Sequence, residues 1–172
     1  MKLNIIITCA VFVLSCSNVS AQVCYDNVSE TTQISRFIDN EDGTVTDSAT
    51  GLMWQRCSIG QTYNSENGGC EGDIKKVDWG EALRAAKNNR LADYSDWQVP
   101  NIKELASIVE HQCVKPSIKI DIFPNTQNVI YWTSTTEKTN VGFAWVYFFD
   151  TGSNELAKKN NFNYLRLVRY EE

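Results

Sequence analysis

The 172-residue chain contains 16 Lys and Arg against 21 Asp and Glu, and its formal net charge of −5 argues against nucleic acid or an anionic membrane as the main partner. Its length fits one domain of ordinary size that can bury a substantial core. The single histidine, together with the absence of HExxH, GxSxG and phosphate-binding glycine-rich motifs, argues against a histidine-based zinc centre or a serine hydrolase, and we expect no cofactor.

The first 21 residues have the pattern of a secretory signal peptide. Lys2 precedes a mostly apolar run over 5–14, and small residues lead to Ala21. We therefore expect cleavage after Ala21, a mature domain over 22–172, and a secreted, periplasmic or cell-surface location. The alternative is processing at Cys16, where the preceding residues loosely match a lipoprotein box and would give a membrane-anchored lipoprotein. No later stretch is long and apolar enough to predict a transmembrane helix.

Three short strands are predicted over residues 36–56. Asn, Asp, Ser and Gly gather at 40–43 and 48–51, and the residues between and after these turns are β-branched, apolar or aromatic. The turn carboxylates invite a calcium interpretation, but an EF-hand loop would need acids where Ile38 and Ala49 stand. Asx turns of a β-meander are favoured, we predict no metal, and a calcium site of another type stays open.

Four cysteines remain in the mature chain, and their even number in an exported protein predicts two disulfides. Cys57 and Cys70 flank a loop rich in Gly, Asn and Ser, which favours a local bridge between them. Cys24 would then pair with Cys113 and clamp the N-terminal arm. Three connectivities are compatible with the sequence. A four-cysteine zinc site is disfavoured because there is no C-x-x-C pair.

Two short amphipathic helices are predicted after the cysteine loop. Asp78 is followed three residues later by Glu, which is the signature of a capping box, and the helix should end near Asn88. Asn101 begins a second pattern of the same kind, with apolar residues recurring on one face up to His111. The imidazole of His111 should lie at the surface or cap the helix rather than act in catalysis.

Strand patterns return in the C-terminal third, over 131–134, 143–149 and 164–170. The order of strands, then two helices, then strands indicates an α+β domain. We expect the tryptophans to pack in the core rather than to stack on sugars. They are Trp54, Trp79, Trp97, Trp132 and Trp145.

Seven sequence blocks occur in an order that resembles the Lcl C-terminal domain family, named for a collagen-like bacterial adhesin. The blocks are GLMWQR at 51–56, WGEAL at 79–83, YSDWQVPNIKEL at 94–105, IFPNT at 122–126, YWTST at 131–135, AW at 144–145 and YLRLVR at 164–169. The resemblance implies a C-type lectin-like single domain with two short helices, small antiparallel sheets and long loops. Formylglycine-generating enzymes share this scaffold. The chain departs from the adhesin in lacking a collagen-like Gly-X-Y region.

By this resemblance, the protein is expected to be an exported bacterial, non-catalytic recognition or adhesion module that binds a glycan or a surface protein. A structural subunit of a surface or pilus-type assembly is the first alternative. A maturation enzyme of the formylglycine-generating type is the second, and it would require free thiols. The oligomeric state stays open.

The densest group of basic side chains lies near the C-terminus, where four fall within twelve residues and could meet sulfate groups on a glycan. The alternative is a solvated edge strand, in which lysines discourage unwanted pairing. Polar residues on loops are further candidates. The candidate ligand-binding residues are Lys158, Lys159, Arg166, Arg169, Asn64 and Asn140.

Overall fold

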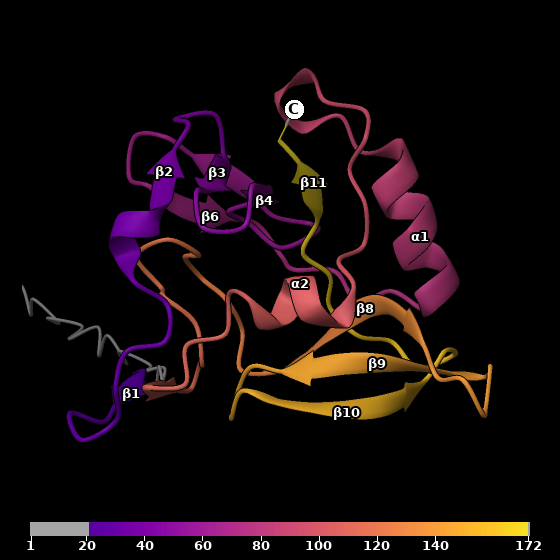
Figure 1. Cartoon of the computed structure of the whole chain (residues 1–172). Helices are drawn as coiled ribbons and strands as arrows, with labels where there is room; N and C mark the ends of the chain where they lie inside the picture. Colours follow the sequence, from indigo (N-terminus) through magenta and orange to yellow (C-terminus); the bar gives the residue numbers. More distant parts are fainter. Residues whose placement is uncertain (1–20, 172) are drawn as a thin grey trace, which may run out of the picture.

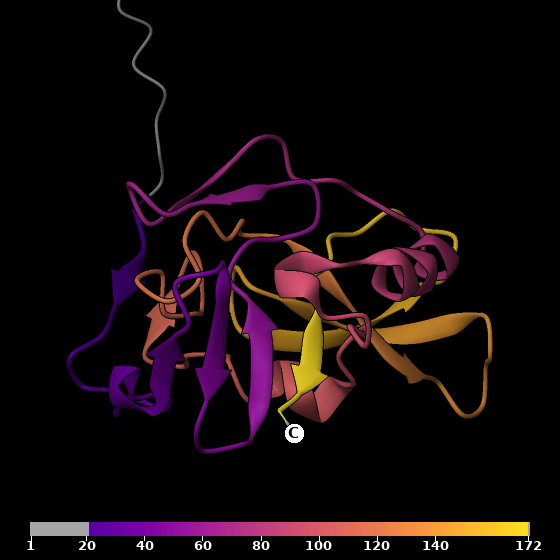
Figure 2. The same ribbon diagram turned by 90° about the horizontal axis from the view of Figure 1, so that it is seen from above.

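The computed structural model describes residues 21–171, in which two α-helices and several small sheets are arranged as an α+β domain (Figures 1 and 2). The expected signal peptide, apart from Ala21, falls outside the described residues. The helices and strands, in chain order, are β1 (Val23–Cys24), β2 (Phe37–Asp39), β3 (Thr44–Asp47), β4 (Leu52–Gln55), β5 (Thr62–Asn64), β6 (Gly69–Glu71), α1 (Trp79–Asn88), α2 (Ile102–Ala106), β7 (Cys113–Val114), β8 (Ile130–Thr136), β9 (Phe143–Phe148), β10 (Ser153–Lys158) and β11 (Val168–Tyr170). Single 3-10 turns span Ile34–Arg36 and Leu91–Asp93.

The four-stranded sheet joins the two ends of the domain. β2, β3 and β4 form the predicted meander, and the C-terminal strand β11 lies against β4, with Val168 opposite Trp54. The predicted strand over 164–170 is therefore shorter than expected. Tyr164 instead bridges Tyr131 of β8, so the segment 164–167 crosses from one sheet to the other.

The second large sheet has the order β10-β9-β8, and Figure 1 shows α2 lying over it. β1 pairs with β7 and β5 with β6 in two-stranded sheets, and every pairing is antiparallel. The sequence pattern does not predict β10, because five of its six residues are exposed at the edge of the sheet and do not alternate between apolar and polar. The two-helix, small-sheet class is as expected, and the C-type lectin-like assignment stays a prediction.

Both helices begin where the capping residues predict. The Asp78 carboxylate accepts a hydrogen bond from the backbone N–H of Glu81 at 2.7 Å, and Glu81 accepts from the N–H of Asp78. The second helix ends at Ala106, not near His111 as expected. Its last turns tighten to i+3 bonds, and the hydroxyl of Ser107 donates to a helical carbonyl, which competes with continued α-helix.

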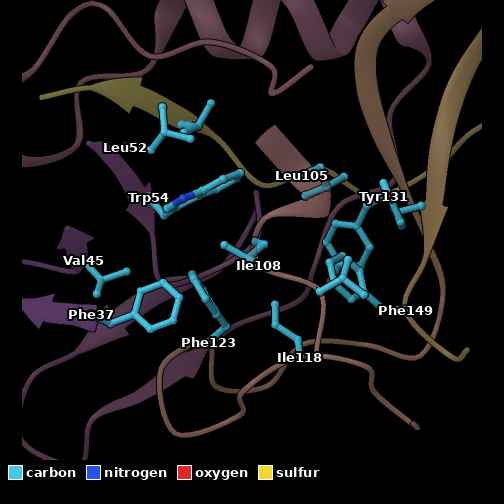
Figure 3. Close-up of a cluster of buried hydrophobic side chains, with 13 residues drawn as sticks. Phe37, Val45, Leu52, Trp54, Leu105, Ile108, Ile118, Phe123, Tyr131 and Phe149 are labelled. Carbon is cyan, nitrogen blue, oxygen red and sulfur yellow. The ribbon is translucent and has the colours of Figure 1, made fainter. Parts of the chain in front are cut away.

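The core consists of two apolar clusters that meet across the sheets. Figure 3 shows Leu105 of α2 between Trp54 of the meander and Tyr131 of β8. Trp132 belongs to the second cluster, together with apolar residues of α1 and of the inner faces of β9 and β10. Trp54, Trp97 and Trp132 are buried as expected. The two remaining tryptophans are half-buried: Trp79 packs against the second cluster, whereas Trp145 belongs to neither cluster among the described residues.

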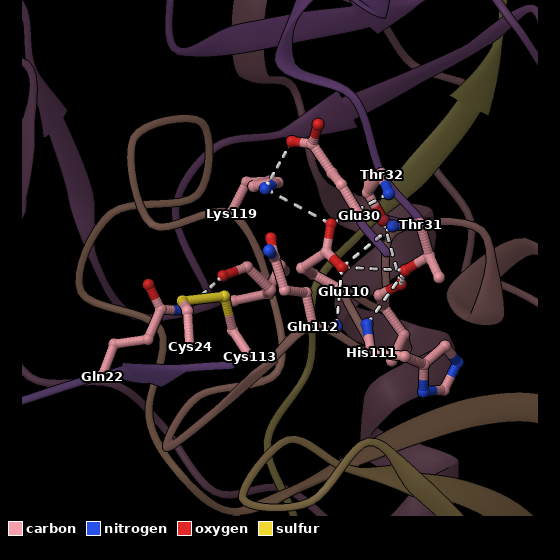
Figure 4. A network of polar contacts seen from close by, with 12 residues as sticks. Gln22, Cys24, Glu30, Thr31, Thr32, Glu110, His111, Gln112, Cys113 and Lys119 are labelled. Atoms are coloured by element: carbon pink, nitrogen blue, oxygen red, sulfur yellow. Dashed lines mark hydrogen bonds and ion pairs between the residues drawn. A yellow bond between two sulfur atoms is a disulfide. The ribbon is translucent and has the colours of Figure 1, made fainter. Parts of the chain in front are cut away.

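The N-terminal arm is attached to the domain by a disulfide and by one buried carboxylate (Figure 4). Both expected disulfides are present, Cys24–Cys113 and Cys57–Cys70. The Glu110 carboxylate is fully buried and accepts hydrogen bonds from the backbone N–H groups of Thr31 at 3.0 Å and Thr32 at 2.9 Å. These bonds lower the pKa of Glu110, although burial alone would raise it.

Candidate functional site

The structure does not bring the four predicted basic residues together on one surface. Arg166 is fully buried, and its guanidinium donates to the backbone carbonyl of Gln55 at 2.8 Å, to that of Arg56, and to Thr126 Oγ1 at 2.8 Å. It therefore cannot contact an external ligand, and its inclusion in the surface cluster was wrong. The physical reason is that residues 164–167 run through the interior between the two sheets. The Arg166 side chain therefore lies beside the backbone carbonyls of Gln55 and Arg56 and not at the surface.

Arg169 is also removed from the predicted cluster. It is 6% exposed, donates from Nε to Asp96 Oδ1 at 2.8 Å, and lies 3.9 Å from the ring centroid of Tyr94. Its hydrogen bond is the main cause of the lowered pKa of the Asp96 carboxyl. Arg169 thus joins β11 to the connector before α2, and it lies away from the lysines of β10.

Lys158, Lys159 and Asn140 do come together, at the end of the β10-β9-β8 sheet. The backbone N–H of Lys159 donates to the carbonyl of Gly142 at 2.9 Å, and the N–H of Gly142 donates to Asn140 Oδ1 at 3.2 Å. Lys158 is exposed. Lys159 is half-buried, because its ammonium lies 3.9 Å from the centroid of the Trp79 ring and donates to Thr136 Oγ1.

Asn64 lies elsewhere, in the hairpin formed by β5 and β6. Its Nδ2 donates to Glu71 Oε1 at 2.6 Å, and its Oδ1 accepts from the backbone N–H of Glu66 at 2.8 Å. These bonds close the hairpin and occupy both ends of the amide. Asn64 therefore has a local structural role in this structure.

A groove that the sequence did not predict lies at the other end of the sheet from Lys158, where Ile130 pairs with Phe148. Its volume is about 230 Å³, and one side is formed by the ends of β8 and β9 and the other by the segment 162–164. The lining residues are Lys76, Val129, Ile130, Phe148, Phe162, Asn163 and Tyr164. It is predominantly apolar and aromatic, with one cation and one amide, which is the usual composition of a site for an organic ligand.

Two features of the groove are unusual for a plain protein surface. The Phe162 ring is 61% exposed, although a phenyl group normally gains free energy by burial. The side chain of Asn163 is buried, yet its Nδ2 has no hydrogen-bond partner within residues 21–171. An unpaired buried donor costs about 1–3 kcal/mol, so a ligand or water that accepts this hydrogen bond would be favoured.

Segment 159–163 connects the groove to the end of the sheet that carries Lys158 and Lys159. Val77 and Asn163 exchange two backbone hydrogen bonds, and the N–H of Trp79 donates to the carbonyl of Lys159, so segment 159–163 runs alongside 77–79. The Lys76 ammonium lies 5.4 Å from the ring centroid of Tyr164. We call this surface the lysine–aromatic strip, and we define it as Lys76, Lys158, Lys159, Phe162 and Tyr164.

A family model described as the Lcl C-terminal domain matches residues 43–169, which is well over half of the chain. The chain belongs to the Lcl C-terminal domain family. A comparison with curated proteins gave no match. The match to the Lcl C-terminal domain begins in the turn before β3 and contains the whole lysine–aromatic strip, whereas the N-terminal arm with β1 lies outside it. Membership in this family suggests a domain of the surface or adhesion type.

Other possible chemical sites in this Lcl C-terminal domain can be described briefly. Within residues 21–171, no group of three or more His, Cys, Asp or Glu side chains could hold a metal ion, and no helix has the length and apolarity required to cross a membrane. The four described cysteines are all in disulfides. His111 is exposed, and Figure 4 shows its imidazole pointing away from the Glu110 network.

Sequence reasoning missed Lys76, Phe162 and Tyr164 as site residues. Phe162 is the one aromatic residue in the polar run Asn160–Asn163, but a single exposed apolar side chain is common on protein surfaces, so the sequence alone did not mark it as a site residue. Nothing in the sequence marked Lys76 either. Its proximity to Tyr164 follows from the bridge between Val77 and Asn163, which pairs segments more than 80 residues apart.

Proposed function

We propose that this protein is a non-catalytic recognition module that binds a glycan along the lysine–aromatic strip. The observation that carries the proposal is the exposed Phe162 ring beside the buried, unpaired Nδ2 of Asn163. An aromatic face can pack against the C–H groups of a sugar ring while a neighbouring amide donates to a hydroxyl or carbonyl oxygen.

The lysines of the strip give the proposed site a preference for negative charge. Lys76 and Lys158 are exposed, and Lys159, next to Lys158 in the chain, lies against Trp79. A glycan with carboxylate or sulfate groups would be attracted to them although the whole chain is acidic, because screening limits long-range repulsion to about 8–10 Å at physiological ionic strength. Binding should therefore weaken as salt is raised.

The proposed module acts outside the cytoplasm, as a secreted, periplasmic or surface protein. The signal-like pattern over 1–21 supports export, and the two disulfides are typical of an oxidising compartment. Lipid attachment at Cys16 is the alternative location. In either case the strip would be presented to ligands outside the cell or in the periplasm.

The test is a glycan array followed by binding isotherms for the exported protein and two variants. We expect Phe162→Ala to weaken binding of the best glycan by about 10-fold or more, because it removes the exposed ring. The double variant Lys76→Glu/Lys158→Glu should weaken an anionic glycan further and reduce the salt dependence. Lys87→Glu/Lys103→Glu is the matched control, since it makes the same charge change at exposed positions of α1 and α2.

Three results would refute this assignment. The first is that Phe162→Ala binds the glycan as tightly as the unchanged protein. The second is that the control pair Lys87→Glu/Lys103→Glu loses as much affinity as Lys76→Glu/Lys158→Glu. The third is that no glycan on the array binds. In the last case the strip would be a solvated edge.

An alternative function, as a structural subunit of a surface or pilus-type assembly, is supported by the open edge of β10. Lys159 N donates toward β9, so by strand alternation the backbone groups of Asn154 and Leu156 point away from the sheet. An exposed edge of this kind can accept a strand from another subunit. Concentration-dependent filaments in sedimentation and electron microscopy would favour assembly.

A maturation enzyme would instead need free thiols, which alkylation without reductant would detect by mass.

A further inference from the structure

A second cavity is lined by none of the residues of the lysine–aromatic strip. It has a volume of about 220 Å³ and is formed by the turn before β3, the end of β4 with the residues after it, β5, and the residues that follow α1. Its polar lining groups belong to Asp42, Gln55, Ser58, Gln61, Thr62 and Asn89. A cavity of about 150 Å³ accommodates benzene, so this one has room for a small organic molecule.

The walls of the cavity are held in place by backbone geometry. Gly43 and Gly60 both have positive φ angles, 88° and 99°, which side chains rarely tolerate. A Cβ at Gly60 would stand 2.5 Å from the carbonyl oxygen of Asp73, so the two chain segments approach as closely as glycine permits. The Cys57–Cys70 disulfide joins the floor of the cavity to the outer strand β6.

Three side-chain oxygens of the lining residues are left without a hydrogen-bond partner within residues 21–171. Gln61 Oε1 is buried and has no partner within residues 21–171. The Nε2 of Gln55 donates to Asn89 Oδ1 at 2.8 Å, which leaves Oε1 as the unused group of that amide. Asp42 uses Oδ1 to accept from the N–H and hydroxyl of Thr44, so its Oδ2 has no partner in the described part of the chain.

The charge of the lining residues also favours a ligand that donates hydrogen bonds. Asp42 is the one charged side chain among the lining residues, and no Lys, Arg or His is among them. A cavity whose one charged lining group is a carboxylate, and which also offers unpartnered oxygens, favours a ligand with hydrogen-bond donors and a positive charge, and disfavours anions. The remaining wall is apolar, formed by Ile59, Leu91 and the Tyr63 ring, and it suits a short hydrocarbon chain.

We infer that this cavity binds a small primary amine. The ammonium group pairs with Asp42 Oδ2 and donates to Gln55 Oε1 and Gln61 Oε1, while the carbon chain lies against Leu91 and Ile59. Three donors on one ammonium match three acceptors that the protein leaves unused. This site does not depend on the proposed glycan function, because none of its lining residues belongs to the strip.

The test uses titration calorimetry of the exported protein with four small probes: putrescine, n-butylamine, n-butanol and butyrate. We expect the two amines to bind, n-butanol to bind at least about 10-fold more weakly than n-butylamine, and butyrate not to bind. Asp42→Asn should weaken the amines by about 10-fold or more, and it keeps the Oδ1 acceptor that Thr44 needs, so the fold should be retained. Gln61→Leu should also weaken them.

Asp26→Asn is the matched control, because Asp26 is exposed on the N-terminal arm. Amide chemical shifts should change at residues 55, 61 and 89 and not along 158–164. The inference is overturned if no amine binds, if butyrate or n-butanol binds as well as n-butylamine, or if Asp42→Asn leaves amine affinity unchanged while its thermal melt shows a folded protein.

Discussion

At the scale of single residues, the most consequential side chain is Arg166. Burial lowers the pKa of its guanidinium to about 10, which still leaves it protonated at neutral pH. Within residues 21–171 its hydrogen bonds go to carbonyl and hydroxyl oxygens rather than to a carboxylate. The positive charge is thus stabilised by dipoles, and the side chain joins the segment before β11 to the end of β4.

Arg166→Met should lower the free energy of unfolding by about 2–4 kcal/mol, because the carbonyls of Gln55 and Arg56 and the hydroxyl of Thr126 would lose their buried donor. Chemical denaturation measures the change. Arg169→Met is the comparison, and it should cost about 1 kcal/mol or less, since its partner Asp96 is half-exposed at 50%. Equal losses in both variants would contradict a special role for Arg166.

The tryptophans divide into structural and surface positions, which leads to a second prediction. Trp132→Ala should destabilise the fold by about 3–5 kcal/mol, because the indole is fully buried and its Nε1 donates to the Val77 carbonyl at 2.8 Å. Trp54→Ala should have a similar effect. Trp79→Ala, at a half-buried position, should cost clearly less. Thermal melts of the three variants give the comparison, and a larger loss for Trp79 than for Trp132 would reverse the assignment.

At the scale of elements, the N-terminal arm and the turn after α2 are coupled through Glu110. Its carboxylate also accepts from the N–H of Gln112 at 2.8 Å and lies 3.3 Å from the Lys119 ammonium, which contacts Glu30 on the arm. Figure 4 shows these groups converging beside the Cys24–Cys113 disulfide. The arm is therefore attached by a covalent bond and by one buried charge.

Acid should weaken this attachment. Because the folded-state pKa of Glu110 lies below its ordinary value of 4.5, its contribution to stability is fully present above that value and is lost as the pH falls through the folded-state pKa. Glu110→Gln should lower the free energy of unfolding by about 1–3 kcal/mol at pH 7 and by less at pH 3. Denaturation at both pH values tests this. A loss that stays constant with pH would show that ionisation of Glu110 does not contribute.

At the scale of the whole molecule, the residue that follows the predicted cleavage site is hydrogen-bonded to the rest of the domain. The side-chain amide of Gln22 donates to the carbonyls of Pro116 at 2.6 Å and Ile118 at 2.7 Å, so the first residue of the predicted mature chain is already part of the structure. Cleavage after Ala21 stays a prediction, and it would leave these two contacts in the mature chain.

N-terminal sequencing of the exported protein should therefore find Gln22 as the first residue. Gln22→Ala should leave processing unchanged but lower the thermal stability slightly, because two hydrogen bonds to the domain are lost. Intact-mass measurement with and without reductant should also show two disulfides. Recovery of a lipid-modified Cys16 as the first residue would place the protein on a membrane and refute cleavage at Ala21.

The sequence was sufficient to predict those elements whose stabilising interactions join residues a few positions apart. The meander follows from turn residues a few positions apart, both capping boxes from pairs three residues apart, and the α+β class from the order of these elements. The early end of α2 and the strand β10 were not predicted. For α2, the hydrogen bond that the buried Glu110 accepts from Thr32 on the N-terminal arm competes with continuation of the helix. For β10, the position at the edge of the sheet removes the alternation of apolar and polar residues.

What the sequence alone determined is thus the α+β class and the family resemblance, whereas among three possible connectivities it only favoured the disulfide pairing that the structure shows. What the tertiary structure decided is which side chains share a surface. Lys158 and Arg166 are close in sequence, yet one is exposed at a sheet edge and the other is buried, whereas Lys76 and Tyr164 are distant and meet across the groove. A binding site is defined by burial and long-range pairing, and neither is encoded by local spacing.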